Sequence, residues 1–232
     1  MTTKKDPTRH GVDNTMRIDV SEGGPYLVSG NVPLKVQIAK SDVSGNAIAW
    51  KAGERIETPD CYALCRCGQS DNKPFCDGSH TSVKFASKET AGDEEYLEHP
   101  EVTEGPTLSM TDIEPLCSGS RFCDAGDGTW SLVEQSGNTE AARSAIEQAC
   151  NCPSGRLTVS DKTGKAIEPK LVKAIGVVED EGTGISGPLW VQGGIPVHSA
   201  DGKSYKVRKR VTLCRCGRSA NKPFCDARHN DD

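Results

Sequence analysis

Short alternations of apolar and polar residues predict β-strands towards both ends of the chain. Residues 34–38 read LKVQI, and residues 205–211 read YKVRKRV, so apolar positions largely alternate with polar ones in both stretches. A period of two is typical of a strand that buries one of its faces. We therefore expect a few antiparallel strands in each of these two regions.

A longer period marks the middle of the chain. In residues 139–149 the apolar positions recur every three or four residues, which predicts a helix capped by Asn138 or Thr139. Further along, apolar positions in residues 157–167 flank the sequence DKTG at 161–164, which favours a tight turn. The middle of the chain is therefore predicted to hold one helix and one small hairpin.

Two stretches of the chain are repeated. Residues 65–80 read CRCGQSDNKPFCDGSH and residues 214–229 read CRCGRSANKPFCDARH, with twelve of sixteen positions identical. Upstream, residues 24–33 match residues 187–196 in the order of their Gly, Pro and apolar residues. The upstream pair is 163 residues apart and the downstream pair 149, so the first copy holds fourteen extra residues. We place them in a lengthened hairpin around residues 43–58.

The repeats divide the chain into blocks. We expect a disordered tail at residues 1–20 and a first β-rich unit at 21–92. A linker and a separate small module follow at 93–174, and a second β-rich unit occupies 175–232. The predicted fold class is α+β: two small units of β-strands, each with a metal loop and a short helix, and a small α+β insert between them.

Composition supports small cores held together by metal. Of the 232 residues 34% are hydrophobic and 5% aromatic, with 24 Gly and 13 Pro, which favours short strands and many turns. The net charge of −5 gives no basic surface for nucleic acid, and no apolar run is long enough to cross a membrane. The first residues lack the apolar stretch of a secretory signal. We expect a cytoplasmic location, where the 11 cysteines serve as ligands rather than disulfides.

Each repeated loop carries four side chains that bind metal. Cys65 and Cys67 are two residues apart, so in an extended segment they point to the same side. Cys76 and His80 are four apart, so on a helical turn they share a face. Two pairs of ligands can hold two metal ions, as in a [2Fe-2S] cluster. The second loop repeats this arrangement with Cys214, Cys216, Cys225 and His229.

A structural zinc ion is the alternative for these ligands. Three thiols and one imidazole also suit zinc, although zinc sites more often use cysteine pairs with two to four residues between them. The spacing therefore favours iron and sulfide. We expect Asp77 and Asp226 to cap the turns that carry the histidines, and the positive end of each turn to keep the imidazole neutral.

The first loop ends in Cys-Asp-Gly-Ser-His, and the sequence resembles the CDGSH (NEET) iron–sulfur family. Ser70 and Pro74 fit the family's pattern, as do Ser219 and Pro223. The resemblance implies a [2Fe-2S] cluster in each loop, held by three cysteines and one histidine, with the histidine on the solvent-facing iron. Since the family's fold unit is a homodimer, it also implies a monomer whose two β-rich units form an intrachain pseudo-dimer, with strands exchanged or paired.

The second loop departs from the family pattern without losing a ligand. Ala227 and Arg228 replace the glycine and serine of the first loop. A cation beside His229 is expected to change the potential and stability of that cluster, so the two clusters are predicted to differ. Lys73 and Lys222 precede the Pro-Phe of each loop. They are candidates for bonding cluster sulfide or an acidic partner, with a solvated side chain as the alternative.

Further cysteines gather in the middle block. Cys117 and Cys123 are spaced as in a ferredoxin run whose central position is Ser120, and Cys152 precedes a proline as in bacterial ferredoxins. The region resembles a divergent single-cluster ferredoxin. Three thiols suit a [3Fe-4S] cluster, whereas a [4Fe-4S] cluster would need Ser120, Cys150 or an outside ligand. Unligated cysteines or a zinc site are the alternatives.

These observations favour an iron–sulfur protein that transfers electrons, or stores and transfers clusters. Its partner would be a redox protein or an apo-protein that accepts a cluster. No catalytic triad, phosphate loop or dinucleotide fingerprint is present, so we do not expect an enzyme. The alternatives are a redox enzyme subunit that uses the clusters as a wire, and a structural zinc-binding protein.

Overall fold

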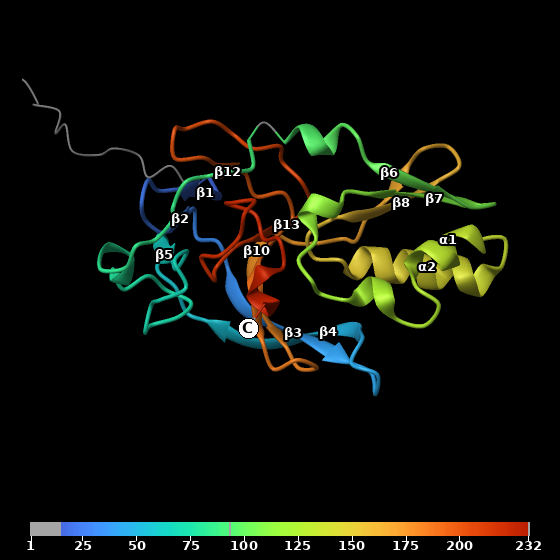
Figure 1. Cartoon of the computed structure of the whole chain (residues 1–232), viewed down its shortest axis with the longest axis horizontal. Helices are drawn as coiled ribbons and strands as arrows, with labels where there is room; N and C mark the ends of the chain where they lie inside the picture. Colours follow the sequence, from blue (N-terminus) through green and yellow to red (C-terminus); the bar gives the residue numbers. More distant parts are fainter. Residues whose placement is uncertain (1–14, 93, 232) are drawn as a thin grey trace, which may run out of the picture.

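The strands of the two outer blocks are shared between two sheets, as the computed structural model shows (Figure 1). In order across the sheet, the first consists of β12 (Val197–His198), β1 (Arg17–Val20), β2 (Tyr26–Ser29) and β5 (Tyr62–Leu64). The second consists of β13 (Arg210–Leu213), β11 (Ser186–Gln192), β10 (Ala174–Asp180), β3 (Leu34–Ser41) and β4 (Ala47–Ile56). The structure describes residues 15–92 and 94–231, so most of the predicted tail lies outside the described residues. The prediction is wrong for the last four residues of the tail, because they form β1.

Each sheet combines strands of both outer blocks. β1 of the first block pairs in parallel with β12 of the third, with Ile18 opposite Val197. β10 of the third block pairs in parallel with β3 of the first, with Ile175 opposite Leu34. All other pairs in the two sheets are antiparallel. The outer blocks therefore complete each other's sheets.

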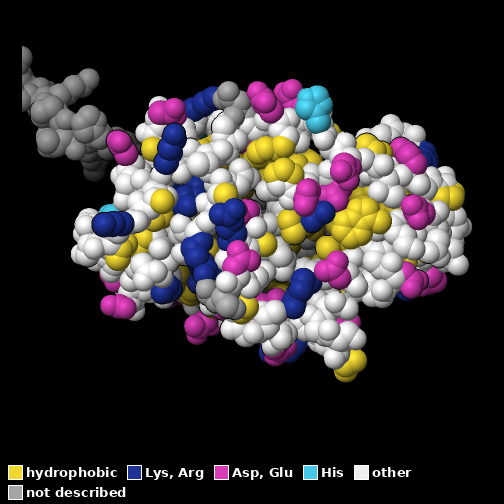
Figure 2. Space-filling model, viewed as in Figure 1, with side chains coloured by type: hydrophobic (Ala, Val, Ile, Leu, Met, Phe, Trp, Pro, Cys, Tyr) yellow, Lys and Arg dark blue, Asp and Glu magenta, His cyan; other side chains and the backbone are white. Residues whose placement is uncertain are grey.

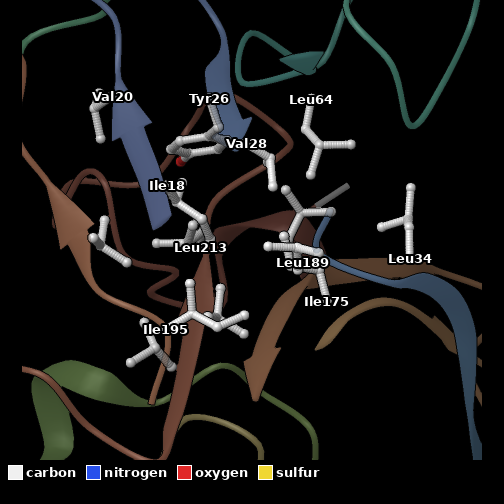
Figure 3. Close-up of a cluster of buried hydrophobic side chains, with 14 of the residues drawn as sticks. Ile18, Val20, Tyr26, Val28, Leu34, Leu64, Ile175, Leu189, Ile195 and Leu213 are labelled. Atoms are coloured by element: carbon white, nitrogen blue, oxygen red, sulfur yellow. The ribbon is translucent and has the colours of Figure 1, made fainter. Parts of the chain in front are cut away.

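One hydrophobic core joins the two sheets. In β1 the alternation of the sequence places Ile18 and Val20 in the core, while Arg17 and Asp19 are only half-buried. Each fully buried aliphatic side chain contributes about 1.5–3 kcal/mol to folding. Figure 3 shows side chains of both outer blocks meeting in this core, among them Tyr26, Val28, Leu64, Ile175, Leu189 and Leu213.

The lengthened hairpin predicted around residues 43–58 is present as β3 and β4, which pair antiparallel. Its turn is held by Asp42, whose carboxylate accepts hydrogen bonds from the backbone amides of Ser44 (2.8 Å) and Asn46 (2.9 Å). Because β4 lies at the edge of its sheet, the additional residues extend the sheet at this edge.

The strand predicted over residues 205–211 is wrong for most of its length, because only Arg210 and Val211 of this stretch lie in a strand. Two of the four polar residues of the alternation, Arg208 and Arg210, turn away from water, whereas Lys206 and Lys209 are exposed. Arg208 lies 3.6 Å from the Glu94 carboxylate, and Arg210 is fully buried against the middle block. These buried charges hold the segment in an irregular path.

The middle block has a sheet of its own, in the order β6 (Glu101–Glu104), β7 (Leu108–Asp112), β8 (Leu157–Asp161) and β9 (Ala166–Ile167). Helices α1 (Thr129–Glu134) and α2 (Thr139–Asn151) pack against one side of it (Figure 1). The predicted helix is α2, and the Asn138 side chain caps it by accepting from the amides of Glu140 and Ala141. The predicted hairpin is formed by β8 and β9.

The remaining helical segments are single 3₁₀ turns: η1 (Ser79–Thr81), η2 (Glu95–Leu97), η3 (Glu114–Leu116), η4 (Phe122–Asp124) and η5 (Arg228–Asn230). The fold is thus rich in strands and poor in helix. No helix within the described ranges is both long enough and apolar enough to cross a membrane.

Aromatic side chains join the middle block to the outer sheets. The ring of Trp50 in β4 lies 4.8 Å from that of Phe122 and 4.7 Å from that of Trp190 in β11, measured between ring centroids. The indole N–H of Trp50 donates to the carbonyl oxygen of Asn151, at the end of α2 (2.9 Å). The lengthened hairpin therefore serves as a contact surface for the insert.

Candidate metal centres

The first repeated loop is fixed by two of its own polar side chains. The Ser70 hydroxyl donates to the Phe75 carbonyl oxygen across the loop (2.7 Å). The Asp77 carboxylate accepts from the backbone amides of Asp71 (2.8 Å) and Ser79 (3.0 Å). These bonds, led by those from Ser79, hold the pKa of Asp77 well below its usual value. The ionised carboxylate therefore ties down the turn that leads to the histidine.

The four candidate ligands of the first loop lie as two pairs. The sulfur atoms of Cys65 and Cys67 are 3.8 Å apart, and the Cys76 sulfur is 3.4 Å from Nδ1 of His80. With metal–sulfur bonds of about 2.3 Å and metal–nitrogen bonds of about 2.0 Å, two ligands on one tetrahedral metal are separated by about 3.8 and 3.5 Å. Each pair thus has the separation of ligands that share one metal.

The second loop repeats this geometry. The sulfur atoms of Cys214 and Cys216 are 3.7 Å apart, and the Cys225 sulfur is 3.4 Å from Nδ1 of His229. Two pairs in each loop fit the two irons of a [2Fe-2S] cluster. Within the described residues, no group of three or more His, Cys, Asp and Glu side chains is gathered around a single ion position.

The two residues that depart from the family pattern lie on the turn before His229. Ala227 keeps the left-handed conformation, with φ of 69°, which costs a non-glycine residue about 1–2 kcal/mol. Arg228 lies 3.4 Å from the Asp226 carboxylate, in the position where the Ser79 hydroxyl donates to Asp77 in the first loop. The Arg228 guanidinium, which was predicted to lie beside His229, therefore forms an ion pair with Asp226.

Other charges act on the imidazole of the second loop. Burial lowers the pKa of His229, and the nearby guanidinium groups of Arg215 and Arg218 lower it further. A neutral imidazole is the form that binds metal, so this environment favours ligation. The pKa of Cys216 is lowered to about 6, chiefly by a hydrogen bond from Cys214, with help from Arg218. One thiol of the pair is therefore readily available as thiolate.

The two loops touch each other at their Cys-x-Cys turns. A Cβ atom on Gly68 would lie 2.4 Å from the carbonyl oxygen of Cys216, and a Cβ on Gly217 would lie 2.4 Å from that of Cys67. Both glycines also have positive φ, 79° and 81°. Only glycine permits this approach, which brings the backbone of one Cys-x-Cys turn against that of the other.

The arginine between the two cysteines of each loop was not singled out from the sequence. Arg66 and Arg215 are both buried, and their Nε atoms donate to the carbonyl oxygens of Gly24 (2.9 Å) and Gly187 (2.5 Å). Each guanidinium thus links a metal loop to the upstream Gly-Pro of its own block. The sequence did contain an indication of this role, because arginine occupies this position in both loops.

Tyr26 is a second residue that the sequence did not indicate. It belongs to the first block, but its hydroxyl reaches the second loop, where it lies 2.8 Å from the carbonyl oxygen of Cys214 and 3.0 Å from that of Pro223. Its counterpart in the repeat is Leu189, which has no hydrogen-bonding group. The second loop therefore receives support from across the core that the first loop lacks.

The lysines that occupy the same position in the two loops have different surroundings. Lys222 is buried, and its ammonium group donates to the carbonyl oxygen of Ser219 (2.6 Å). Lys73 is exposed and lines a cavity of about 390 Å³ between the two loops, together with Cys216 and Arg218. Figure 2 shows Lys and Arg side chains gathered over the C-terminal segment. A local positive surface thus adjoins one candidate ligand.

The middle block brings three of its cysteines to one small cavity, lined by Cys117, Cys123 and Cys152. Burial raises the pKa of Cys123, and the neighbouring charges of Asp124, Cys152 and Cys117 raise it further. A bound metal would stabilise such a buried thiol as the thiolate. The donor set therefore fits an iron–sulfur cluster.

The two optional ligands of the middle site differ in position. Ser120 lines the cavity, and its hydroxyl lies 3.1 Å from that of Ser118. Cys150 is absent from the residues that line the cavity, and its thiol is 3.6 Å from the carbonyl oxygen of Ile167. The geometry thus favours Ser120 over Cys150 as a fourth ligand.

The fold and these sites define an iron–sulfur protein with two matched loops and a cysteine site between them. Residues 23–81 and 186–230 match the family described as iron-binding zinc finger, CDGSH type, and residues 103–162 match divergent 4Fe-4S mono-cluster domains. The chain therefore contains two domains of the CDGSH family that flank a divergent single-cluster module. Searches of curated proteins and of solved structures returned no match.

Proposed function

We propose that the chain carries a [2Fe-2S] cluster in each CDGSH-type loop and a third cluster in the middle module, and that it transfers electrons. The pairing of ligands at chelating distances in both loops carries the proposal. The contact between the two Cys-x-Cys turns supports it, because electron transfer needs centres that lie close together. The outer blocks would act as an intrachain pseudo-dimer in a monomeric, cytoplasmic carrier that is not itself an enzyme.

Cluster transfer is the second candidate function. His80 is only half-buried, and imidazole is more readily displaced from iron than thiolate is. An acceptor could therefore reach the first cluster. The positive surface around Lys73 and Arg218 would suit an acidic partner in either role.

Anaerobic purification with iron and sulfide analysis tests the cluster content. We expect visible absorbance, with four iron ions from the two loops and three or four more from the middle site, about seven or eight per chain. Reversible reduction by dithionite, followed by electron paramagnetic resonance, tests the redox role. A colourless protein that carries stoichiometric zinc would contradict the proposal.

A cysteine variant should remove the middle cluster alone. We expect Cys123→Ala to lower the iron content by three or four per chain while the [2Fe-2S] signals remain, because this thiol lines the middle cavity. Cys150→Ala is the matched control, because Cys150 is not among the residues that line the cavity. Equal iron contents in the two variants would argue against a cluster in this cavity.

A further inference from the structure

The two CDGSH-type loops have nearly the same sequence but differ in exposure. In the first loop Lys73 is exposed, and Cys76 and His80 are half-buried. The matching residues of the second loop are buried, with exposed fractions of 5% for Lys222, 2% for Cys225 and 8% for His229. The second loop must therefore be covered by parts of the chain that leave the first loop open.

The segment that joins the first unit to the middle module forms part of this cover. It begins at Thr90, three residues before the boundary predicted from the sequence, and is called the linker below. The backbone amides of Thr90 and Ala91 both donate to the carbonyl oxygen of Lys222 (2.8 and 2.9 Å), and the Thr90 hydroxyl donates to that of Ala220 (2.5 Å). Three hydrogen bonds thus hold the linker against the second loop, at positions three and five residues before Cys225.

The cysteine loop of the middle module forms the rest. The Asn221 side chain donates to the carbonyl oxygen of Pro115 (3.1 Å). A Cβ atom on Gly119 would lie 2.4 Å from Nδ2 of Asn230 and 3.0 Å from the Cβ of Ala227. The backbone of the middle module therefore packs directly on the turn that carries His229.

We propose that the middle module and its linker cap the second CDGSH-type site, so that the chain releases the cluster of the first site and keeps the second. This inference rests on the cluster binding proposed above. The acceptor would be an apo-protein with free cysteines. Four of its thiols replace three cysteine thiolates and one imidazole on iron. Three of their protons pass to the released cysteines and the fourth to the released imidazole, and iron does not change oxidation state. Because the cap excludes such thiols from His229, exchange takes place at His80.

Chelation of the clusters tests the cap. The isolated holo-protein is held at pH 8 with excess EDTA, and the [2Fe-2S] signals are followed by electron paramagnetic resonance of reduced samples. We expect two phases of equal size, with the second at least about tenfold slower, which corresponds to about 1.4 kcal/mol of added protection. His80→Cys should slow only the fast phase, which assigns that phase to the first site.

A matched pair of variants separates the cap from the loop itself. Asn221→Ala removes the bond to Pro115 and should speed the slow phase several-fold, whereas Asn72→Ala, at the same position of the first loop, should leave it unchanged. Thr90→Val, which removes the linker bond to Ala220, should act as Asn221→Ala does.

The outcomes distinguish the cap from cluster binding. Release of both clusters at one rate, or a slow phase indifferent to both Asn221→Ala and Thr90→Val, would overturn the cap while the proposed function stands. A protein isolated without iron and sulfide would overturn both.

Discussion

Replacing Arg210 with alanine is expected to lower the free energy of unfolding by about 3–5 kcal/mol, the usual cost of breaking a buried ion pair from one side. The guanidinium of Arg210 is buried and pairs with both carboxylate oxygens of Glu168 (2.9 and 2.8 Å). It also donates to the carbonyl oxygens of Ala149 (2.5 Å) and Cys152 (2.9 Å), where α2 ends. Urea unfolding monitored by circular dichroism measures the change.

Arg210 also positions the middle site, so Arg210→Ala should affect the middle cluster as well as the stability of the fold. Without the bond to its carbonyl oxygen, the Cys152 loop is free to move, and the middle cluster should be lost more readily than the clusters of the loops. Arg55→Ala is the control, because its pair with Glu57 is exposed and surface pairs contribute about 0–1 kcal/mol. Similar losses of stability and of the middle cluster in both variants would contradict this role of Arg210.

Acidification from pH 8 to pH 5 is expected to release the cluster of the first loop before that of the second. Iron binds imidazole only in its neutral form, so protonation of a histidine ligand weakens the hold on the cluster. Burial, with Arg215 and Arg218, lowers the pKa of His229, so its neutral form persists to lower pH. Below a pKa the neutral fraction falls about tenfold per pH unit, so the rates should separate clearly.

Visible absorbance recorded over time at fixed pH measures this loss. His80→Cys should abolish the acid sensitivity of the early phase, because that ligand no longer competes with protons in this range. His229→Cys is the matched variant and should leave the early phase as it is. Equal rates of loss at pH 6 and pH 8 would contradict the prediction.

Local features of the molecule follow from the sequence because they depend on short spacings. The ligand pairs of each loop lie within sixteen residues, and α2 with its Asn138 cap is set by neighbours in the chain. The lengthened hairpin followed from the unequal spacing of the repeats. For the ligand pairs and the helix, the physical cause lies within a few residues, where pattern and structure are directly linked.

Features that depend on distant partners could not be predicted. Lys73 and Lys222 lie in the same sequence, Asn-Lys-Pro-Phe-Cys-Asp, yet one is exposed and the other buried, because only the second is covered by the linker. The Tyr26 hydroxyl meets a loop 188 residues away. The alternation at residues 205–211 was misleading because buried arginines look like a solvated face when their partners are unknown.

The exchange of strands between the outer blocks bears on how the two halves can change over time. Two identical chains related by symmetry must carry identical loops, so any substitution appears at both sites at once. Here β1 with β12, and β3 with β10, form within a single polypeptide. One half can therefore acquire Ala227 and Arg228 while the other keeps Gly78 and Ser79. Because both halves lie in one chain, each loop can change independently while the strand pairing between the halves is kept.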